Sequence, residues 1–206
     1  MKFHNFLDDI LSSRVKLDIL RAFYKHMTKE FTERELADYI KRWQSPVNYA
    51  IKDLVSSNVL RMKVIGRANV YTLNPESYFV KNCLLLFEAE KGILANLIRL
   101  IKKELKNTLS VILYGSLVNG KEKPKSDIDL LIVCRNKRAT EKKIISLQDK
   151  VSKVFGNAIV PHILTEDELN RKKNKPFIKN AFKKGIRVMG KLWELQGSIK
   201  GHIKTT

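Results

Sequence analysis

Cysteine and histidine are scarce in this chain, and their scarcity argues against whole classes of structure. The 206 residues include two cysteines, Cys83 and Cys134, and four histidines, with no Cys-x-x-Cys motif. A zinc site or a disulfide framework needs more of these residues at closer spacing. Because each cysteine stands among apolar neighbours, we expect two buried free thiols in a reducing compartment.

Long apolar runs and a secretion signal are absent as well. No run of eighteen consecutive residues is apolar throughout, so the sequence predicts no membrane span. The N-terminal stretch MKFHNFLDDILSSR has acidic residues where a signal peptide would have its apolar core. We therefore expect a cytoplasmic protein without membrane contact, and the length suggests one large or two small domains.

Basic residues, in contrast, are in large excess and are unevenly distributed. The chain has 40 Lys and Arg against 21 Asp and Glu, a net charge of +19. Residues 1–80 have a net charge of +4, and residues 81–206 have a net charge of +15. Although many lysines serve only to solubilise helix faces, such an excess favours a polyanionic partner, either nucleic acid or nucleotide phosphate.

The first part of the chain predicts three helices followed by a hairpin. Apolar residues recur at helical spacing over residues 14–26, and Thr32 with Glu35 forms a capping box for a second helix. Ser45, followed by proline, predicts the cap of a third helix. Two strand-like runs follow, at Leu60–Ile65 and Asn69–Leu73.

Three helices and a hairpin in this order resemble the winged helix-turn-helix fold over about residues 1–75. In that fold the third helix enters the DNA major groove and the wing contacts the backbone. The resemblance implies the following DNA-contacting residues: Gln44, Ser45, Asn48, Tyr49, Lys52, Arg61, Lys63 and Arg67. Winged helices also bind proteins or dimerise, and +4 is a modest charge, so a protein partner stays open.

Residues 76–106 predict one long helix, or two helices broken near Gly92. Apolar residues recur along this segment at a helical period, and no proline interrupts it. Such a stripe can pack into a core or form the seam of a homodimer. We therefore expect a connecting helix between two domains.

The most informative stretch is VILYGSLVNGKEKPKSDIDLLIV at residues 111–133. Two apolar runs predict buried strands, the first ending at Gly115-Ser116 and the second containing Asp127 and Asp129. Because strand side chains alternate, both acids point to the same side. Adjacent carboxylates repel each other unless a cation lies between them, and Mg²⁺ fits such oxygen ligands. A helix capped by Ser116 would offer backbone N–H groups to phosphate, which together suggests a nucleoside triphosphate site.

These residues resemble the signature of the DNA polymerase β-like nucleotidyltransferases, which is Gly-Ser, a spacer and Asp-x-Asp. Ten residues, 117–126, separate Ser116 from Asp127, as in the minimal branch of that superfamily. The alternative interpretation, a surface turn followed by a solvated strand edge, does not explain why both acids lie within an apolar run.

The resemblance implies transfer of a nucleoside monophosphate from a triphosphate to a hydroxyl acceptor. Asp127 and Asp129 would be catalytic and would hold Mg²⁺ or Mn²⁺, while Gly115, Ser116 and Ser126 would bind the nucleotide. Nearby lysines in the spacer, Lys121, Lys123 and Lys125, would add positive charge or form a solvated loop. The acceptor, whether protein, RNA or a small molecule, stays open, and minimal members are often paired with a partner protein, sometimes as antitoxins.

One departure from the family pattern concerns a third carboxylate. Many members carry it on the strand that corresponds to Ala158–Leu164, where it helps to hold the metal and activate the hydroxyl. This strand contains no acid here, although it contains His162, and Glu166 follows its end. The chemistry could be slower, borrow a base from a partner or be lost, and His162 could be a substitute base or a structural residue.

The remaining sequence predicts helices alternating with strands over a small mixed sheet, an α+β fold. A helix over residues 140–155, a helix capped by Thr165, the helix Pro176–Lys184 and a short strand at Ile186–Met189 complete it. We expect a winged-helix domain at 1–75, a connecting helix at 76–107, a nucleotidyltransferase-like domain at 108–196 and a flexible tail at 197–206.

The sequence alone leaves three functions open. The first is a nucleotidyltransferase that its winged helix locates on DNA or on a partner. The second is a DNA-binding transcriptional regulator whose transferase-like domain senses nucleotide or is inactive. The third is an antitoxin-type protein that mainly binds a partner.

Overall fold

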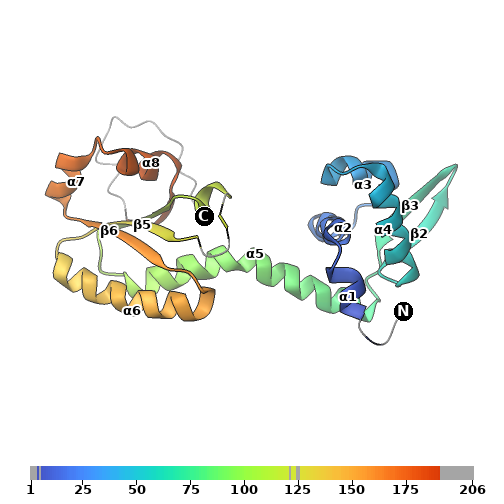
Figure 1. Cartoon of the computed structure of the whole chain (residues 1–206), viewed down its shortest axis with the longest axis horizontal. Coiled ribbons are helices and arrows are strands. Elements are labelled where there is room, and N and C mark those ends of the chain that lie inside the picture. Colours follow the sequence, from blue (N-terminus) through green and yellow to red (C-terminus); the bar gives the residue numbers. More distant parts are fainter. Residues whose placement is uncertain (1–3, 5, 121, 124–125, 191–206) are drawn as a thin grey trace. The chain divides into compact units, whose positions relative to one another are not determined.

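The computed structural model describes residues 4, 6–120, 122–123 and 126–190. The chain forms two compact units, Met1–Gly92 and Ile93–Thr206. Figure 1 labels all of the helices α1 to α8 and some of the strands of both units. The tail predicted at residues 197–206 lies outside the described residues. The expected α+β fold class is confirmed, since helices accompany two separate sheets.

Four short helices and the first part of a long one form the helical portion of the first unit. They are α1 (Phe6–Leu11), α2 (Arg14–Lys25), α3 (Glu33–Ile40), α4 (Gln44–Ser56) and the beginning of α5 (Tyr78–Glu104). The predicted capping box is confirmed, because Thr32 Oγ1 accepts from the Glu35 N–H and Glu35 accepts from the Thr32 N–H. Helix α1 was not predicted from the sequence.

A three-stranded antiparallel sheet completes the first unit. It consists of β1 (Phe31–Thr32), β2 (Leu60–Ile65) and β3 (Ala68–Leu73), in the order β1-β3-β2. Strands β2 and β3 pair along their full length as a hairpin, which turns at Gly66 with a φ of +61°. The helix order and this hairpin match the predicted winged helix-turn-helix fold (Figure 1).

The predicted start of the third helix was wrong by two residues. Helix α4 begins at Gln44, and Trp43 occupies its N-cap without a side-chain hydrogen bond. Ser45 therefore lies inside the first turn, where its hydroxyl cannot serve as the cap. Pro46 is tolerated at this place because the first N–H groups of a helix have no intrahelical partner.

A single apolar core holds the first unit together. Buried aromatic and aliphatic side chains from α2, α3, α4 and the hairpin meet residues of the first half of α5, among them Phe23, Phe31, Leu36, Ile51, Leu54, Val80 and Phe87. Cys83 lies in this core as a free thiol, and burial raises its pKa. The prediction of a buried free thiol is confirmed here, and Cys134 is likewise free and buried.

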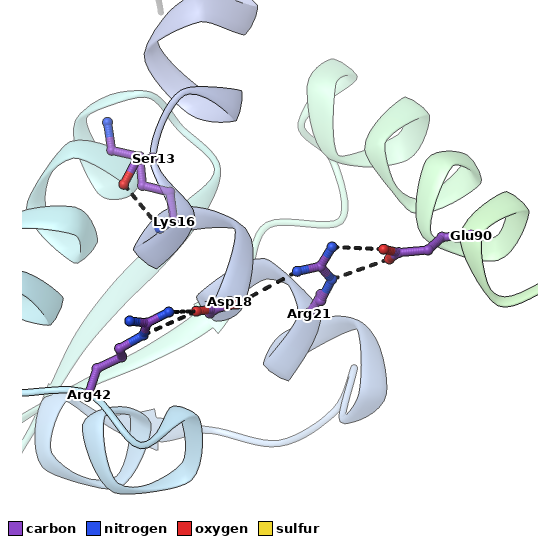
Figure 2. Close-up of polar contacts among 6 residues, drawn as sticks. All are labelled: Ser13, Lys16, Asp18, Arg21, Arg42 and Glu90. Atoms are coloured by element: carbon purple, nitrogen blue, oxygen red, sulfur yellow. Dashed lines mark hydrogen bonds and ion pairs between the residues drawn. The ribbon is translucent and has the colours of Figure 1, made fainter. Parts of the chain in front are cut away.

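Ion pairs at the surface of the first unit join α2 to α5 and to the segment before α4 (Figure 2). The Asp18 carboxylate on α2 pairs with Arg42, just before α4, at 2.9 Å and with Arg21 at 3.6 Å. Arg21 also pairs with Glu90 on α5 at 2.8 Å. These contacts connect the segment before α4, through α2, to the first half of α5. The Arg42 guanidinium is therefore engaged by Asp18.

The connecting segment forms one helix, α5, without a break at Gly92. This settles the choice that the sequence left open between one helix and two. Its second half buries Leu97, Ile98 and Ile101 in the core of the second unit. None of the helices among the described residues combines the length and the apolar character needed to cross a membrane.

The second unit is built on a mixed four-stranded sheet. Its strands are β4 (Ser110–Tyr114), β5 (Ile128–Val133), β6 (Ile159–Leu164) and β7 (Ile186–Gly190), in the order β6-β5-β4-β7. Strands β5 and β6 are parallel, and the other pairs are antiparallel. The expected mixed sheet is confirmed.

Helices cover both faces of this sheet, so that two apolar layers form. Helix α6 (Lys137–Phe155) and the second half of α5 pack against one face, and α7 (Glu166–Lys172) and α8 (Pro176–Lys184) pack against the other (Figure 1). Because side chains alternate along each strand, Leu130 and Ile132 face α6 while Leu131 and Val133 face α8. Asp129 therefore points to the same face as Leu131.

Candidate active site

The two sequence-predicted acids lie beside the predicted Gly-Ser turn. Asp129, near the start of β5, is the Cα partner of Tyr114, the last residue of β4. Gly115 follows directly and has a φ of +87°. A Cβ atom at Gly115 would lie 2.0 Å from Asp129 Oδ2. Glycine is therefore needed here for its backbone conformation and for the space that the Asp129 carboxylate occupies.

The loop between the two strands is held by three side chains. Asn119 Nδ2 donates to the Gly115 carbonyl at 2.8 Å. Ser126 Oγ accepts from the Lys123 N–H at 2.8 Å, and the Ser126 carbonyl accepts from Asn157 Nδ2 at 2.9 Å. Ser126 thus shapes the loop that leads to Asp127, and its predicted role in nucleotide binding stays a prediction. Lys121 and Lys125 lie outside the described residues.

The helix expected after Ser116 was wrong. Residues Leu117–Asn119 form a single 3₁₀ turn, η1, and Ser116 makes no capping hydrogen bond. Gly120 ends this turn with a φ of +62°. The Asn119 side chain binds back to the Gly115 carbonyl, which favours a tight turn over a continuing helix. The loop backbone, and not a helix N-terminus, is what lies next to Asp129.

The electrostatics of the acid pair suit a cation. Asp127 is exposed, whereas Asp129 is half-buried. The pKa of Asp129 is raised, because burial raises it and the Asp127 charge raises it further, against a lowering by His162. Within the described residues, neither carboxylate forms an ion pair with a lysine or an arginine. Neighbouring oxygen ligands of like charge fit a hard divalent cation such as Mg²⁺.

An aromatic group borders the acid pair on the same face of the sheet. Tyr114 Oη lies 2.9 Å from His162 Nδ1, and the His162 ring lies 4.6 Å from the ring of Phe177 on α8. Burial and the Asp129 charge raise the pKa of Tyr114 to about 12, so its hydroxyl keeps its proton at neutral pH. His162 is therefore already engaged by two neighbours.

Among the described residues, no third acid joins Asp127 and Asp129. In the parallel pairing of β5 and β6, the Cα partner of Asp129 is Val160. Glu166 lies beyond Leu164, the last residue of β6, and is the first residue of α7. In the part of the chain that the structure describes, no group of three or more His, Cys, Asp and Glu could hold a metal ion.

The predicted DNA-contacting residues of α4 are not equally accessible. Ser45, Lys52 and Tyr49 are exposed, with Tyr49 at 72%. Asn48 was expected to be exposed, but it is half-buried, and its Oδ1 is buried without a hydrogen-bond partner. The helical phase explains this, because Asn48 adjoins Val47, which is fully buried. Gln44 is exposed at the start of the helix.

The wing presents both basic and apolar side chains. Arg61 pairs with Glu76 and Lys63 pairs with Glu30, so both cations are partly neutralised. Arg67 is exposed beside the turn of the hairpin. Apolar residues that were not predicted to be exposed are Met62, Val64 and Ile65 of β2, and Trp43 before α4, which is 87% exposed. The composition of β2 is also typical of a buried strand, so the sequence did not indicate that these side chains are exposed.

Three residues at the acid pair were not predicted from the sequence. Asn119 and Asn157 hold the loop, and Tyr114 engages His162. The Gly-Asn turn at 156–157 was visible in the sequence, but its contact with Ser126, 31 residues away, was not. Only the pairing of strands brings these side chains together.

Comparison with known proteins identifies part of the chain with a family. Residues 95–192 match the family model described as "Polymerase beta, Nucleotidyltransferase". A search of curated proteins found no match.

Several solved structures are similar to parts of the chain. NolR from Sinorhizobium fredii is 21% identical over 42% of this chain and 81% of its own, with a TM-score of 0.36. Reduced HlyU from Vibrio cholerae N16961 is 20% identical over 40% of this chain and 82% of its own, with a TM-score of 0.34. A mutant of the toxin–antitoxin MntA-HpeT is 14% identical over 50% of this chain and 77% of its own, with a TM-score of 0.38. By the family match, residues 95–192 form a domain similar to the polymerase β nucleotidyltransferases, and a winged helix-turn-helix fold precedes it in the chain.

Proposed function

We propose that the second unit transfers a nucleoside monophosphate from a nucleoside triphosphate to a hydroxyl acceptor. The observation that carries the proposal is the contact between Gly115 and Asp129 within the segment that matches the family model. A glycine turn pressed against a strand carboxylate lets backbone N–H groups and acidic oxygens face the same small volume. Phosphates and a divalent cation both fit such a volume.

The chain's own residues have separate roles in this proposal. Asp127 and Asp129 would hold Mg²⁺ or Mn²⁺, and a bound cation would supply positive charge against the triphosphate. The backbone at Gly115 and Ser116 binds the outer phosphates. Ser126, bonded to the Lys123 N–H and to Asn157, fixes the loop that positions Asp127. Tyr114 stays protonated and donates or accepts at His162 beside the acid pair.

The experiment that tests the transferase is pyrophosphate release. The full chain is incubated with each of the four ribonucleoside triphosphates and Mg²⁺, with and without added protein, RNA or small hydroxyl acceptors. We expect release with at least one nucleotide and its loss in Asp129→Asn. Release that is equal in the native protein and the variant would contradict the proposal, because it would arise without the acid pair.

The winged helix locates the transferase on DNA or on a partner protein, in our proposal. Ser45, Tyr49 and Lys52 form the exposed face of α4 that would meet a major groove, with Arg67 at the wing. The exposed Met62, Val64 and Ile65 of β2 favour a protein contact at the wing, since phosphates offer nothing to apolar side chains. Helix α4 would therefore contact DNA, and β2 would contact a protein.

A DNA titration tests the assignment of α4. If Lys52 contacts a phosphate, Lys52→Ala weakens binding of duplex DNA and lowers the magnitude of the salt slope by about 0.9. Lys81→Ala, an exposed lysine on α5 in the same unit, serves as the matched control. An equal effect of both variants, measured by fluorescence anisotropy between 50 and 200 mM salt, would show that α4 does not contact the DNA.

The missing third carboxylate supports a second candidate function, a DNA-binding regulator that binds nucleotide without transferring it. Val160 stands beside Asp129 where an acid would help to activate the acceptor. Mg²⁺-dependent nucleotide binding without pyrophosphate release, together with DNA affinity that changes with nucleotide, would favour this regulator over the transferase.

A further inference from the structure

The residue next to Asp129 on the neighbouring strand has no side-chain atom that could bind a cation. Val160 is the Cα partner of Asp129 in the parallel pairing of β5 and β6. Paired residues of neighbouring strands direct their side chains to the same face of the sheet. Val160 is 36% exposed, and its aliphatic side chain points to the same face of the sheet as Asp129. A carboxylate at this place would reach a cation held by Asp129, and valine cannot.

The next residue on that face, His162, contacts other side chains. His162 is the Cα partner of Leu131 and lies two residues after Val160 on β6. Its Nδ1 is bonded to Tyr114 Oη at 2.9 Å, and its ring packs on Phe177 at 4.6 Å. The described residues contain no group of three acids, histidines or cysteines suited to a metal, so His162 does not complete one with Asp127 and Asp129.

Two carboxylates leave most of the coordination sphere of a cation unfilled. Mg²⁺ takes six oxygen ligands, and two protein carboxylates supply only part of them. Because the described residues offer no third acid, histidine or cysteine to the pair, substrate phosphates and water would supply the remainder. Two-metal sites place their cations about 3.5–4 Å apart and hold both with shared carboxylates. With valine beside Asp129, a second cation has no further protein ligand on β6.

We propose that this site holds one divalent cation per chain, and holds it firmly only together with a nucleoside triphosphate. The inference rests on the proposed function, since it assumes that Asp127 and Asp129 face bound nucleotide. It goes beyond that function by fixing the number of cations and by making nucleotide a ligand of the cation. The residue that sets this number is Val160.

Counting bound Mn²⁺ tests the proposal without measuring turnover. The full chain is dialysed to equilibrium against Mn²⁺ alone and against Mn²⁺ with α,β-methylene analogues of the four triphosphates, which cannot lose pyrophosphate. Bound metal is counted by atomic absorption. We expect one Mn²⁺ per chain with the preferred analogue, and an affinity lower by about tenfold or more without it.

The possible counts separate this proposal from the function on which it rests. Two Mn²⁺ per chain with bound analogue, or one Mn²⁺ held equally well without it, would overturn the one-cation site while leaving a nucleotide site in place. Failure of both Mn²⁺ and the analogues to bind would overturn the proposed function as well.

A matched pair of variants tests the role of Val160. Val160→Asp places a carboxylate beside Asp129, and Val160→Asn has the same size without the charge. We expect Val160→Asp to bind Mn²⁺ without nucleotide about tenfold more tightly than Val160→Asn, which should resemble the native protein. β6 is an edge strand and Val160 is partly exposed, so both variants should fold, which thermal unfolding checks. Equal Mn²⁺ affinities of the two folded variants would overturn the role of Val160. The number of Mn²⁺ ions bound by the native chain is a separate measurement that does not depend on either variant.

Discussion

The contact between Gly115 and Asp129 links the sequence motif to a physical requirement. The φ of +87° at Gly115 disfavours any residue with a Cβ, and the nearest atom to such a Cβ would be Asp129 Oδ2 at 2.0 Å. A substitution would therefore strain the backbone and push the carboxylate away at the same time. Gly120 has a similar φ of +62°, but no atom lies within 4 Å of the Cβ position.

This difference predicts the outcome of two alanine substitutions. Gly120→Ala should lower the free energy of unfolding by about 1–2 kcal/mol, the cost of a left-handed conformation in a residue with a Cβ. Gly115→Ala should cost more and should also weaken triphosphate binding by about tenfold, because Asp129 must move. Denaturant unfolding and nucleotide titration measure the two effects. Equal losses of stability and of binding in both variants would mean that the Asp129 contact has no influence on the site.

At the level of single residues, the sequence predicts what a local pattern determines. Alternation predicted Asp127 and Asp129 on the same side of one strand, but β5 begins at Ile128, so only Asp129 lies within the strand. Tyr114 and His162 are 48 positions apart, so only the fold brings them together. Asn48 was predicted to be exposed, but it is half-buried because it lies beside the buried face that Val47 and Ile51 form on α4.

Among the elements, the two capping boxes were predictable because each is complete within four residues. Thr32 with Glu35 begins α3, and Thr165 with Glu168 begins α7. The turn after Ser116 was not predictable in the same way, because the Asn119 side chain competes with the helix by binding the Gly115 carbonyl. Local hydrogen bonds of this kind decide between a helix and a turn.

Glu168 should make the second unit sensitive to acid. Hydrogen bonding to Lys137 and to the Thr165 N–H lowers the pKa of Glu168 from 4.5 to about 2. A lowered folded-state pKa stabilises the fold above the unfolded value, and this stabilisation is lost as the pH falls from 4.5 towards 2. Glu168→Gln should therefore reduce the pH dependence of unfolding in that window.

Thermal unfolding between pH 2 and pH 6 checks this expectation. Glu166→Gln, at an exposed residue of the same helix turn, is the control. If Glu168→Gln follows the native curve across the whole window while the control does too, the pairing with Lys137 does not contribute to acid sensitivity.

At the scale of the whole molecule, composition and periodicity predicted a helix-rich first part, a long connecting helix and a mixed sheet. The strand order β6-β5-β4-β7 could not be predicted from the sequence, because β7 pairs with β4 across more than seventy residues. The charge distribution, with +15 of the +19 in residues 81–206, agrees with a nucleotide site in the basic part of the chain.

The most direct test of a nucleotide site at the acid pair is a binding measurement. Each of the four ribonucleoside triphosphates is titrated, with and without Mg²⁺, into the native protein and into the Asp127→Asn/Asp129→Asn double variant. We predict Mg²⁺-dependent binding of at least one triphosphate to the native protein and its loss in the double variant. The absence of binding to any of the four, or equal binding to the native protein and the double variant, would contradict the account.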